Sequence, residues 1–244
     1  MANNNYWLDR MENVQKLTNK QVTQRIKKLY QKANKRINKE INNIWMQMLE
    51  DGEISTANLY KGMRFSNLQN LLQSELLSLS RESEKYLSAA LLKVVEQGFT
   101  DMNRYINKPT DFTIMDAQTA KQIIAQQYKG AVFSERIWDN TNKLRGVIEN
   151  KIIDTAILGK DVRKVSKELN SLMGSGYSQS KRIVITETSR VYNEGCRQKA
   201  QDNGYKTYHL LLEPDACEEC VALEHEHFNI NESVLPIHPF VVAV

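Results

Sequence analysis

Residues 26–48 read IKKLYQKANKRINKEINNIWMQM, and their apolar members recur every three or four positions. This period places the apolar side chains on one stripe of an α-helix. Neither glycine nor proline occurs in residues 8–50, so we expect helix throughout this range, ending at Asp51-Gly52. The stretch predicts a protein built from long amphipathic helices.

The helical spacing continues beyond this stretch. We expect a second helix with a break near Gly62 and apolar residues between Leu68 and Leu79, and a third over about residues 81–106. The sequence Asn107-Lys108-Pro109-Thr110 marks a predicted boundary, because proline disfavours helix in the residue before it. We therefore divide the chain into a basic helical N-terminal region, at about residues 1–108, and a second domain, at about residues 109–244.

Shorter helices are predicted in the second domain. They cover about residues 116–128, 134–158, 161–172 and 178–203, with Gly159 as a left-handed cap and Gly174-Ser175-Gly176 as a turn. Aromatic and branched residues at 205–212 (YKTYHLLL) indicate a strand, and residues 227–230 a second, shorter one. The predicted fold class is mainly α: long N-terminal helices followed by a helical domain with a small α+β, zinc-knuckle-like end at about residues 205–244.

Length and composition are those of an ordinary globular protein. Of the 244 residues, 41% are hydrophobic and 25% are charged, and a chain of this length can bury a core without covalent staples. No apolar run approaches the roughly 20 residues that span a bilayer, and residues 1–5 lack the apolar stretch of a signal peptide. We therefore expect no membrane partner. Of the three cysteines, Cys196 is expected to pack on a helix.

Positive charge is concentrated near the N-terminus. Residues 1–50 hold ten Lys and Arg against four Asp and Glu, a net charge of +6, whereas the remainder holds 23 against 25. A basic helix of this kind can lie along double-stranded DNA and release counterions from the phosphates. The alternative is a solvated helix face, since no base-reading motif accompanies the charge. The predicted DNA-binding residues are Lys27, Lys28, Lys32, Lys35 and Arg36.

A set of short motifs follows in a fixed order over the last 65 residues. A helix carries Thr-Glu-Thr, a strand follows, then a Cys-x-x-Cys pair preceded by an aspartate, and His-Pro lies near the end. In this order and spacing the chain resembles the head-morphogenesis family of tailed phages, the minor head proteins of the Mu F-like type, over about residues 115–240. The residues that carry the family motif are Arg182, Thr186, Glu187, Thr188, Asn193 and Asp215.

The cysteine pair suggests a metal site. Two cysteines separated by two residues, as in Cys217 and Cys220, can direct both sulfurs to one zinc ion, which then needs two further ligands. The candidates for these are His238 together with His225 or His227. Zinc is therefore a candidate cofactor that would hold together a segment poor in apolar residues. The alternative is a zinc-free loop with two reduced thiols.

The chain departs from the family at its end. The resemblance implies Cys-Arg-Cys soon after His238-Pro239, but the sequence continues Phe240-Val241-Val242-Ala243-Val244. Deleting one T from TTT TGT CGT TGC, which encodes Phe-Cys-Arg-Cys, gives codons for Phe-Val-Val-Ala. We therefore hypothesise that a deletion shifted the reading frame after Pro239, which leaves the zinc site without its expected cysteine ligands.

The resemblance implies a minor capsid protein rather than an enzyme. Such a protein associates with the portal protein, and with capsid or scaffold proteins, during head assembly in the host cytoplasm, and then resides in the capsid interior or at the portal vertex. Glu187 is then expected to form structural ion pairs with Arg182 and Arg190, and such a pair to orient the strand and the cysteine segment. The alternatives from other classes are a metal-dependent nuclease, whose metal would need an open coordination position, and a DNA-binding protein.

Overall fold

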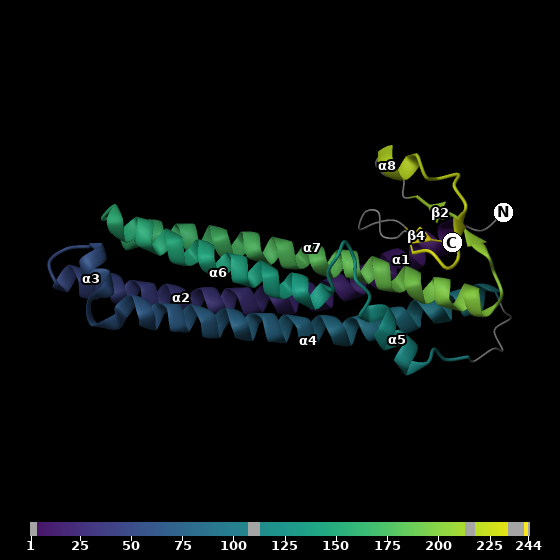
Figure 1. Cartoon of the computed structure of the whole chain (residues 1–244), viewed down its shortest axis with the longest axis horizontal. Coiled ribbons are helices and arrows are strands. Elements are labelled where there is room, and N and C mark those ends of the chain that lie inside the picture. The colour runs from purple at the N-terminus through teal and green to yellow at the C-terminus, as the bar shows by residue number, and fades with distance from the viewer. Residues whose placement is uncertain (1–3, 107–112, 213–217, 234–241, 244) are drawn as a thin grey trace. The chain divides into compact units, whose positions relative to one another are not determined.

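The computed structural model describes residues 4–106, 113–212, 218–233 and 242–243, and it confirms a mainly helical protein (Figure 1). Among these residues, no helix combines the length and the apolar character needed to cross a membrane. The helices are α1 (Asn4–Thr18), α2 (Gln24–Glu50), α3 (Thr56–Tyr60), α4 (Arg64–Ile106), α5 (Ala117–Ile124), α6 (Phe133–Ile157), α7 (Val162–Asp202) and α8 (Glu218–Val221). A π-helical segment, η1 (Asn19–Thr23), joins α1 to α2, and a 3-10 turn, η2 (Lys61–Met63), precedes α4.

The predicted helix over residues 8–50 is confirmed, because α1, η1 and α2 follow one another without a break. It ends at the predicted glycine, Gly52, whose φ of 109° lies where L side chains are strained. Gly159, predicted as a left-handed cap, likewise has a φ of 60° just after α6. The break near Gly62 is also present, as a kink between α3 and α4.

Two predicted interruptions are wrong. Residues 64–106 form one helix of 43 residues, where two helices were expected. The predicted turn at Gly174-Ser175-Gly176 lies inside α7, a continuous helix of 41 residues. Gly176 serves packing: a Cβ at this position would lie 2.8 Å from Leu144 Cδ2 and 3.0 Å from Tyr30 Cε1.

The chain forms two compact units, each assembled from separate segments. Unit 1 contains residues 1–23, 86–133 and 182–244, and unit 2 contains residues 24–85 and 134–181. Helices α4 and α7 each contribute residues to both units. The predicted domain boundary at residues 108 and 109 lies outside the described residues, and each unit draws segments from both sides of it.

Unit 2 contains a bundle of four long helical segments, namely α2, the first half of α4, α6 and the first half of α7, together with the short helix α3 (Figure 1). The buried residues of α2 include Ile26, Ile37 and Met48, which are spaced by 11 residues. Eleven residues correspond to three helical turns at 3.67 residues per turn, close to the 3.6 of a straight helix. A row of side chains with this spacing therefore stays on the core face over the whole helix.

A buried polar layer crosses the core of unit 2. The hydroxyls of Tyr30 and Ser180 lie 3.0 Å apart, and Asn140 Nδ2 donates to Tyr30 Oη at 3.1 Å and to Ser180 Oγ at 3.0 Å. Burial raises the pKa of Tyr30 to about 12, so its hydroxyl stays protonated at neutral pH. Satisfied polar layers of this kind fix which helix faces meet, because any other pairing would leave a polar group buried without a partner.

Unit 1 combines α1, α5, the second halves of α4 and α7, and the C-terminal strands. The strands β1 (Thr207–Tyr208) and β3 (Phe228–Asn229) pair antiparallel, as do β2 (Leu210–Leu211) and β4 (Val242–Ala243). These short ladders confirm strands near both predicted positions.

Within unit 1, two glycines allow α4 and α7 to pack backbone against backbone. A Cβ on Gly98 would lie 2.2 Å from the carbonyl oxygen of Tyr192, and a Cβ on Gly195 would lie 2.3 Å from that of Val95. Neither contact is possible for a larger residue without moving a helix. Cys196 lies at the same crossing, and its thiol donates to the Gly98 carbonyl at 3.2 Å. It is buried on a helix as predicted, and this burial raises the pKa of the thiol.

We predict that Gly98→Ala and Gly195→Ala each destabilise the protein by about 1–3 kcal/mol or more, because the added methyl meets backbone that cannot move aside. Gly174→Ala, on the same helix as Gly195, is the matched control, since nothing lies within 4 Å of its Cβ position. The control should gain about 0.5–1 kcal/mol from the higher helix propensity of alanine. Thermal unfolding of the variants measures both effects, and a fall in melting temperature for all three variants alike would contradict this account.

Candidate functional site

The family-motif residues lie on the part of α7 that belongs to unit 1, and most of them face inward. Glu187 and Thr188 are completely buried, Asn193 is 2% exposed and Thr186 6% exposed. Arg182, at the start of the segment, is exposed. Asp215 lies outside the described residues. The motif therefore consists mainly of interior residues.

Glu187 forms a buried ion pair with Arg190, one helical turn further along α7. The Nε of Arg190 donates to Oε2 of Glu187 at 2.9 Å, and the two side chains are 3% and 0% exposed. The remaining nitrogens of Arg190 donate to the backbone oxygens of Ile123 at 2.9 Å and Ile124 at 3.3 Å. These oxygens belong to the last residues of α5, where carbonyls lack partners within the helix. Arg190 thus caps α5 and fixes it to α7.

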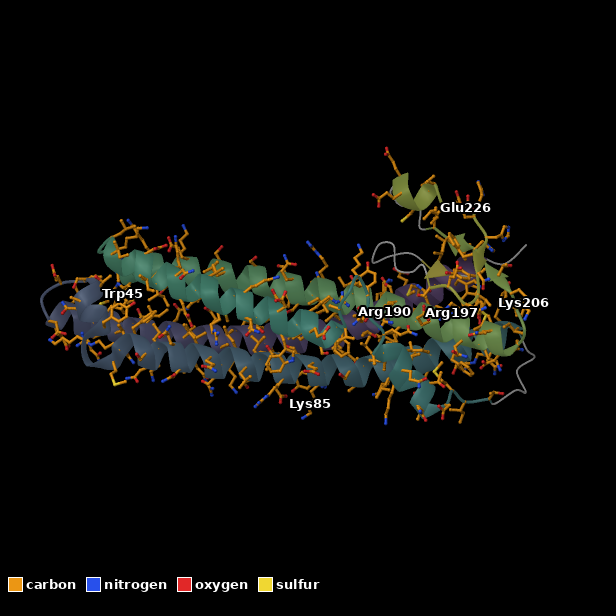
Figure 2. All side chains as sticks on the ribbon, in the orientation of Figure 1. Trp45, Lys85, Arg190, Arg197, Lys206 and Glu226 are labelled. Atoms are coloured by element: carbon orange, nitrogen blue, oxygen red, sulfur yellow. The ribbon has the colours of Figure 1, made fainter. Side chains whose placement is uncertain are left out.

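A second pair repeats this arrangement seven residues later. Arg197 donates from Nε to Oε2 of Glu194 at 3.0 Å, and the side chains are 13% and 3% exposed. The guanidinium also donates to the carbonyl of Ile230, and the Ser233 hydroxyl donates to Oε1 of Glu194. Arg190 and Arg197 follow one another along α7 (Figure 2). We expected the pair at Glu187 to orient the C-terminal segment; the contacts show Glu194 and Arg197 in that position and Arg190 at α5.

A third buried charge holds α1 in unit 1. Asp101 of α4 is 1% exposed, and Arg10 of α1 donates to its Oδ1 at 2.7 Å. Tyr192 of α7 donates to Oδ2 at 3.1 Å, and Tyr6 of α1 donates to the backbone oxygen of the same aspartate at 3.1 Å. Burial raises the pKa of Tyr192, so its hydroxyl remains a proton donor to the carboxylate. Asp101 therefore joins three helices.

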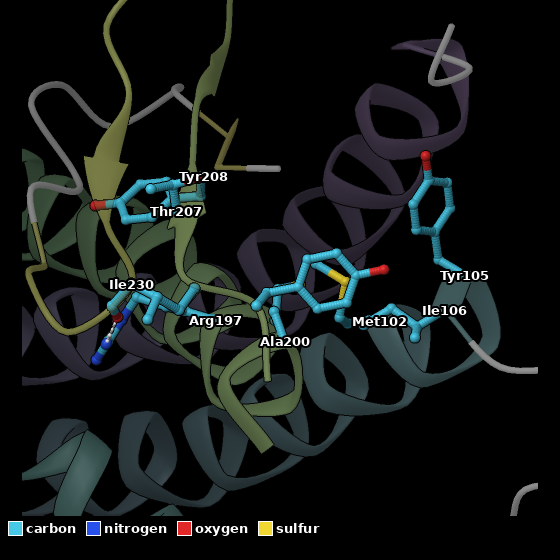
Figure 3. A pocket seen from close by; sticks show the side chains of 10 residues that line it. Met102, Tyr105, Ile106, Arg197, Ala200, Thr207, Tyr208 and Ile230 are labelled. Carbon is cyan, nitrogen blue, oxygen red and sulfur yellow. Dashed lines mark hydrogen bonds between the residues drawn. The ribbon is translucent and has the colours of Figure 1, made fainter. Parts of the chain in front are cut away.

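Two cavities are lined by residues of unit 1 that the structure describes, one apolar and one polar. A small apolar pocket of about 70 Å³ is lined by Met102, Tyr105 and Ile106 at the end of α4, together with residues of α7 and β1 (Figure 3). Ligand sites generally have several hundred cubic ångströms, so this pocket is too small for one. A polar cavity of about 430 Å³ is bordered by Arg190 and Arg197, whose guanidiniums already bind glutamates and carbonyls.

The predicted metal ligands are only partly described. Cys220 is buried on α8, whereas His225 and His227 are exposed; Cys217 and His238 lie outside the described residues. Within the described ranges, no group of three or more His, Cys, Asp and Glu side chains is placed to hold a metal ion. The zinc site predicted from Cys217, Cys220, His238, His225 and His227 remains a prediction.

The predicted DNA-binding residues share the outer surface of α2. Lys27, Lys28, Lys32, Lys35 and Arg36 are all exposed. Lys28, Lys32 and Lys35 are spaced by four and three residues, which places them on one face, opposite the buried row that includes Ile26 and Ile37. Arg36 also pairs with Glu75 of α4 at 2.7 Å.

Several residues that organise this region were missed in the sequence. No motif in the neighbouring sequence identifies Gly98, Gly195, Asp101 or Arg10, because each of them contacts a residue far away in the chain. The second ion pair had a detectable signal: Glu-x-x-Arg occurs at 187–190 and again at 194–197, seven residues later on the same helix face.

Comparison of the chain with protein-family models, with curated proteins and with solved structures gives no match. The resemblance to the head-morphogenesis family therefore depends on the motif residues themselves.

We predict that Arg190→Ala destabilises the protein by about 3–5 kcal/mol, because it leaves the Glu187 carboxylate buried without its cation and removes the arginine donors from two α5 carbonyls. Replacing both partners by methionine should cost less than Arg190→Ala alone, since no lone charge then remains buried. Arg182→Ala, an exposed position on the same helix, is the control and should stay within about 0.5 kcal/mol of the wild type. Denaturant unfolding measures all three. A double variant less stable than Arg190→Ala would contradict the proposed pairing.

Proposed function

We propose that this protein is a minor head protein of a tailed phage, which associates with the portal protein and with capsid or scaffold proteins during head assembly. The sequence resemblance supplies the family. The supporting observation from the structure is that Glu187, at the centre of the Thr-Glu-Thr motif, is fully buried and bound to Arg190. The motif thus organises packing in unit 1, as expected of a structural component.

The same observation weighs against the enzymatic alternative. A general base must come within hydrogen-bonding distance of the proton that it removes. Glu187 is 0% exposed, and its Oε2 already accepts a hydrogen bond from Arg190. Glu194 is 2% exposed and is bound by Arg197 and Ser233 in the same way. The carboxylates of the motif helix are therefore arranged to hold neighbouring segments in place.

The proposal includes contact with packaged double-stranded DNA through α2. This helix holds seven Lys and Arg against two Glu, and its basic face is exposed. Residues 205–244, in contrast, hold one lysine against seven acidic residues, so the DNA phosphates would repel the C-terminal segment. The charge distribution therefore favours α2 as the DNA-facing element.

The C-terminal segment is proposed to be zinc-knuckle-like, with Cys217 and Cys220 as the thiolate ligands and histidines completing the site. The ladders of this segment contain only two residue pairs each, too few for independent stability. A bound metal would supply the missing stability. The proposed location of the protein is the capsid interior or the portal vertex.

If the protein is a head component, purified phage particles should contain it in few copies per portal, and gene deletion should reduce the yield of infectious particles. Quantitative mass spectrometry of heads and plaque counts measure these outcomes. The control is complementation with the wild-type gene and with a Gly174→Ala gene, both of which should restore the yield. Heads that lack the protein and form normally without it would overturn the proposal, as would metal-dependent cleavage of DNA by the purified chain.

Changing Lys27, Lys28, Lys32, Lys35 and Arg36 to Ala should weaken binding of double-stranded DNA and flatten its salt dependence. Each lost phosphate contact lowers the slope of log affinity against log salt by about 0.9. The matched control removes five exposed positive charges from α6 and α7 instead, at Lys143, Arg163, Lys164, Lys167 and Lys181. Fluorescence anisotropy over a salt series measures both. Equal losses in the two variants would indicate a net-charge effect and contradict a specific DNA-facing role for α2.

A further inference from the structure

Two histidines face each other across the β1–β3 ladder. The antiparallel register pairs Thr207 with Asn229 and Tyr208 with Phe228, so the next position along each chain brings His209 opposite His227. Residues directly opposite each other in an antiparallel pair project from the same face of the ladder. The ring contact agrees with this register, since the two imidazole centroids lie 6.3 Å apart.

This separation is close to that of two imidazoles on one metal ion. A metal–nitrogen distance of about 2.1 Å places the ion about 3.2 Å from each ring centre. Two such rings lie about 5.2 Å apart at a tetrahedral angle and about 6.4 Å apart when they are collinear with the metal. The observed 6.3 Å falls between these limits, near the upper one.

We propose that His209 and His227 form a two-imidazole site for a divalent transition-metal ion. Imidazole is the commonest protein ligand for such ions, and its affinity rises from cobalt through nickel to copper. His227 is exposed and His209 half-buried, so the remaining coordination positions of the ion are open to water. His209 is not one of the predicted zinc ligands. His227 is one of them, and here it is proposed to bind the metal together with His209 instead of with the cysteines.

The position of the pair indicates what the metal would do. Beyond the two residue pairs of the ladder, His209 and His227 would add a third link between the chain after β1 and the chain before β3. A metal bound only when these segments are together stabilises the paired state by a free energy that grows with the logarithm of its concentration relative to the dissociation constant. The site would therefore fasten the C-terminal ladder. It stands apart from the proposed role in head assembly, because it concerns the ladder alone.

Nickel titration of the full chain tests the site. Calorimetry should show one bound Ni²⁺, and His209→Ala and His227→Ala should each weaken it by at least about tenfold, since residues that merely orient a ligand already contribute that much. Thr207→Ala is the matched control: it removes an exposed side chain of the same ladder that carries no ligating nitrogen, and it should leave the affinity unchanged. Should His209→Ala fail to fold, His209→Phe keeps a ring at that position without a ligating nitrogen.

The absorption spectrum separates this site from a cysteine site. The first equivalent of Ni²⁺ should bind without a thiolate-to-metal charge-transfer band and should raise the melting temperature of the wild type but of neither histidine variant. Unchanged affinity in His209→Ala or in His227→Ala would overturn the proposal. A loss of equal size in His225→Ala, or a thiolate band with the first equivalent, would likewise overturn it, in favour of the cysteine-based set.

Discussion

The close approach of α4 and α7 at Gly98 and Gly195 is the constraint on which the rest of unit 1 depends. Because each glycine leaves room for a backbone carbonyl of the other helix, the residues around the crossing come within hydrogen-bonding distance. Tyr192 then reaches Asp101, and the same aspartate binds Arg10 of α1. A wider crossing would separate Tyr192 from Asp101 and would remove one donor from a buried carboxylate, at a cost of about 1.5–3 kcal/mol for a hydrogen bond to a charged group. The N-terminal helix α1 is therefore held by Asp101, and the position of Asp101 depends on the absence of a Cβ at Gly98 and Gly195.

From this crossing, α7 carries two glutamate–arginine pairs that fasten different parts of unit 1. Arg190 holds the end of α5, and Arg197 holds the chain at Ile230. Buried ion pairs contribute little net stability compared with apolar packing, because desolvation offsets the attraction. What they add here is specificity: each arginine binds backbone carbonyls that only one arrangement of the neighbouring segment presents. This explains why ionic residues stand at interior positions where leucine would pack as well.

The helical character of these regions, though not the continuity of α4 and α7, was predictable from sequence because their core residues keep one period. On α4, Phe65, Leu76 and Leu87 are buried at intervals of 11 residues, and the next position is Gly98. On α7, the row through Val165 continues to Gly176 and then to Glu187. The predicted turn at Gly174–Gly176 is wrong because a glycine can also serve close packing inside a helix, and the place of Gly176 in this row indicates such a packing position. Contacts between residues far apart in the chain, such as Arg10 and Asp101, could not be predicted from sequence. Local periodicity indicates which face of a helix is buried, but it does not indicate which helices pack against each other.

The buried position of Glu187 indicates what the Thr-Glu-Thr motif does in the fold. Glu187 sits in an apolar row of α7, so its presence in a related chain would indicate the same packing of α7 against its neighbours before it indicated any shared activity. Under the proposed function, contacts with DNA or protein partners are made by surfaces outside the buried part of the motif. The basic face of α2 is one such surface, and the acidic C-terminal segment is another. The motif helix positions the second of these through Glu194 and Arg197, whose contacts with Ser233 and Ile230 make the segment part of unit 1.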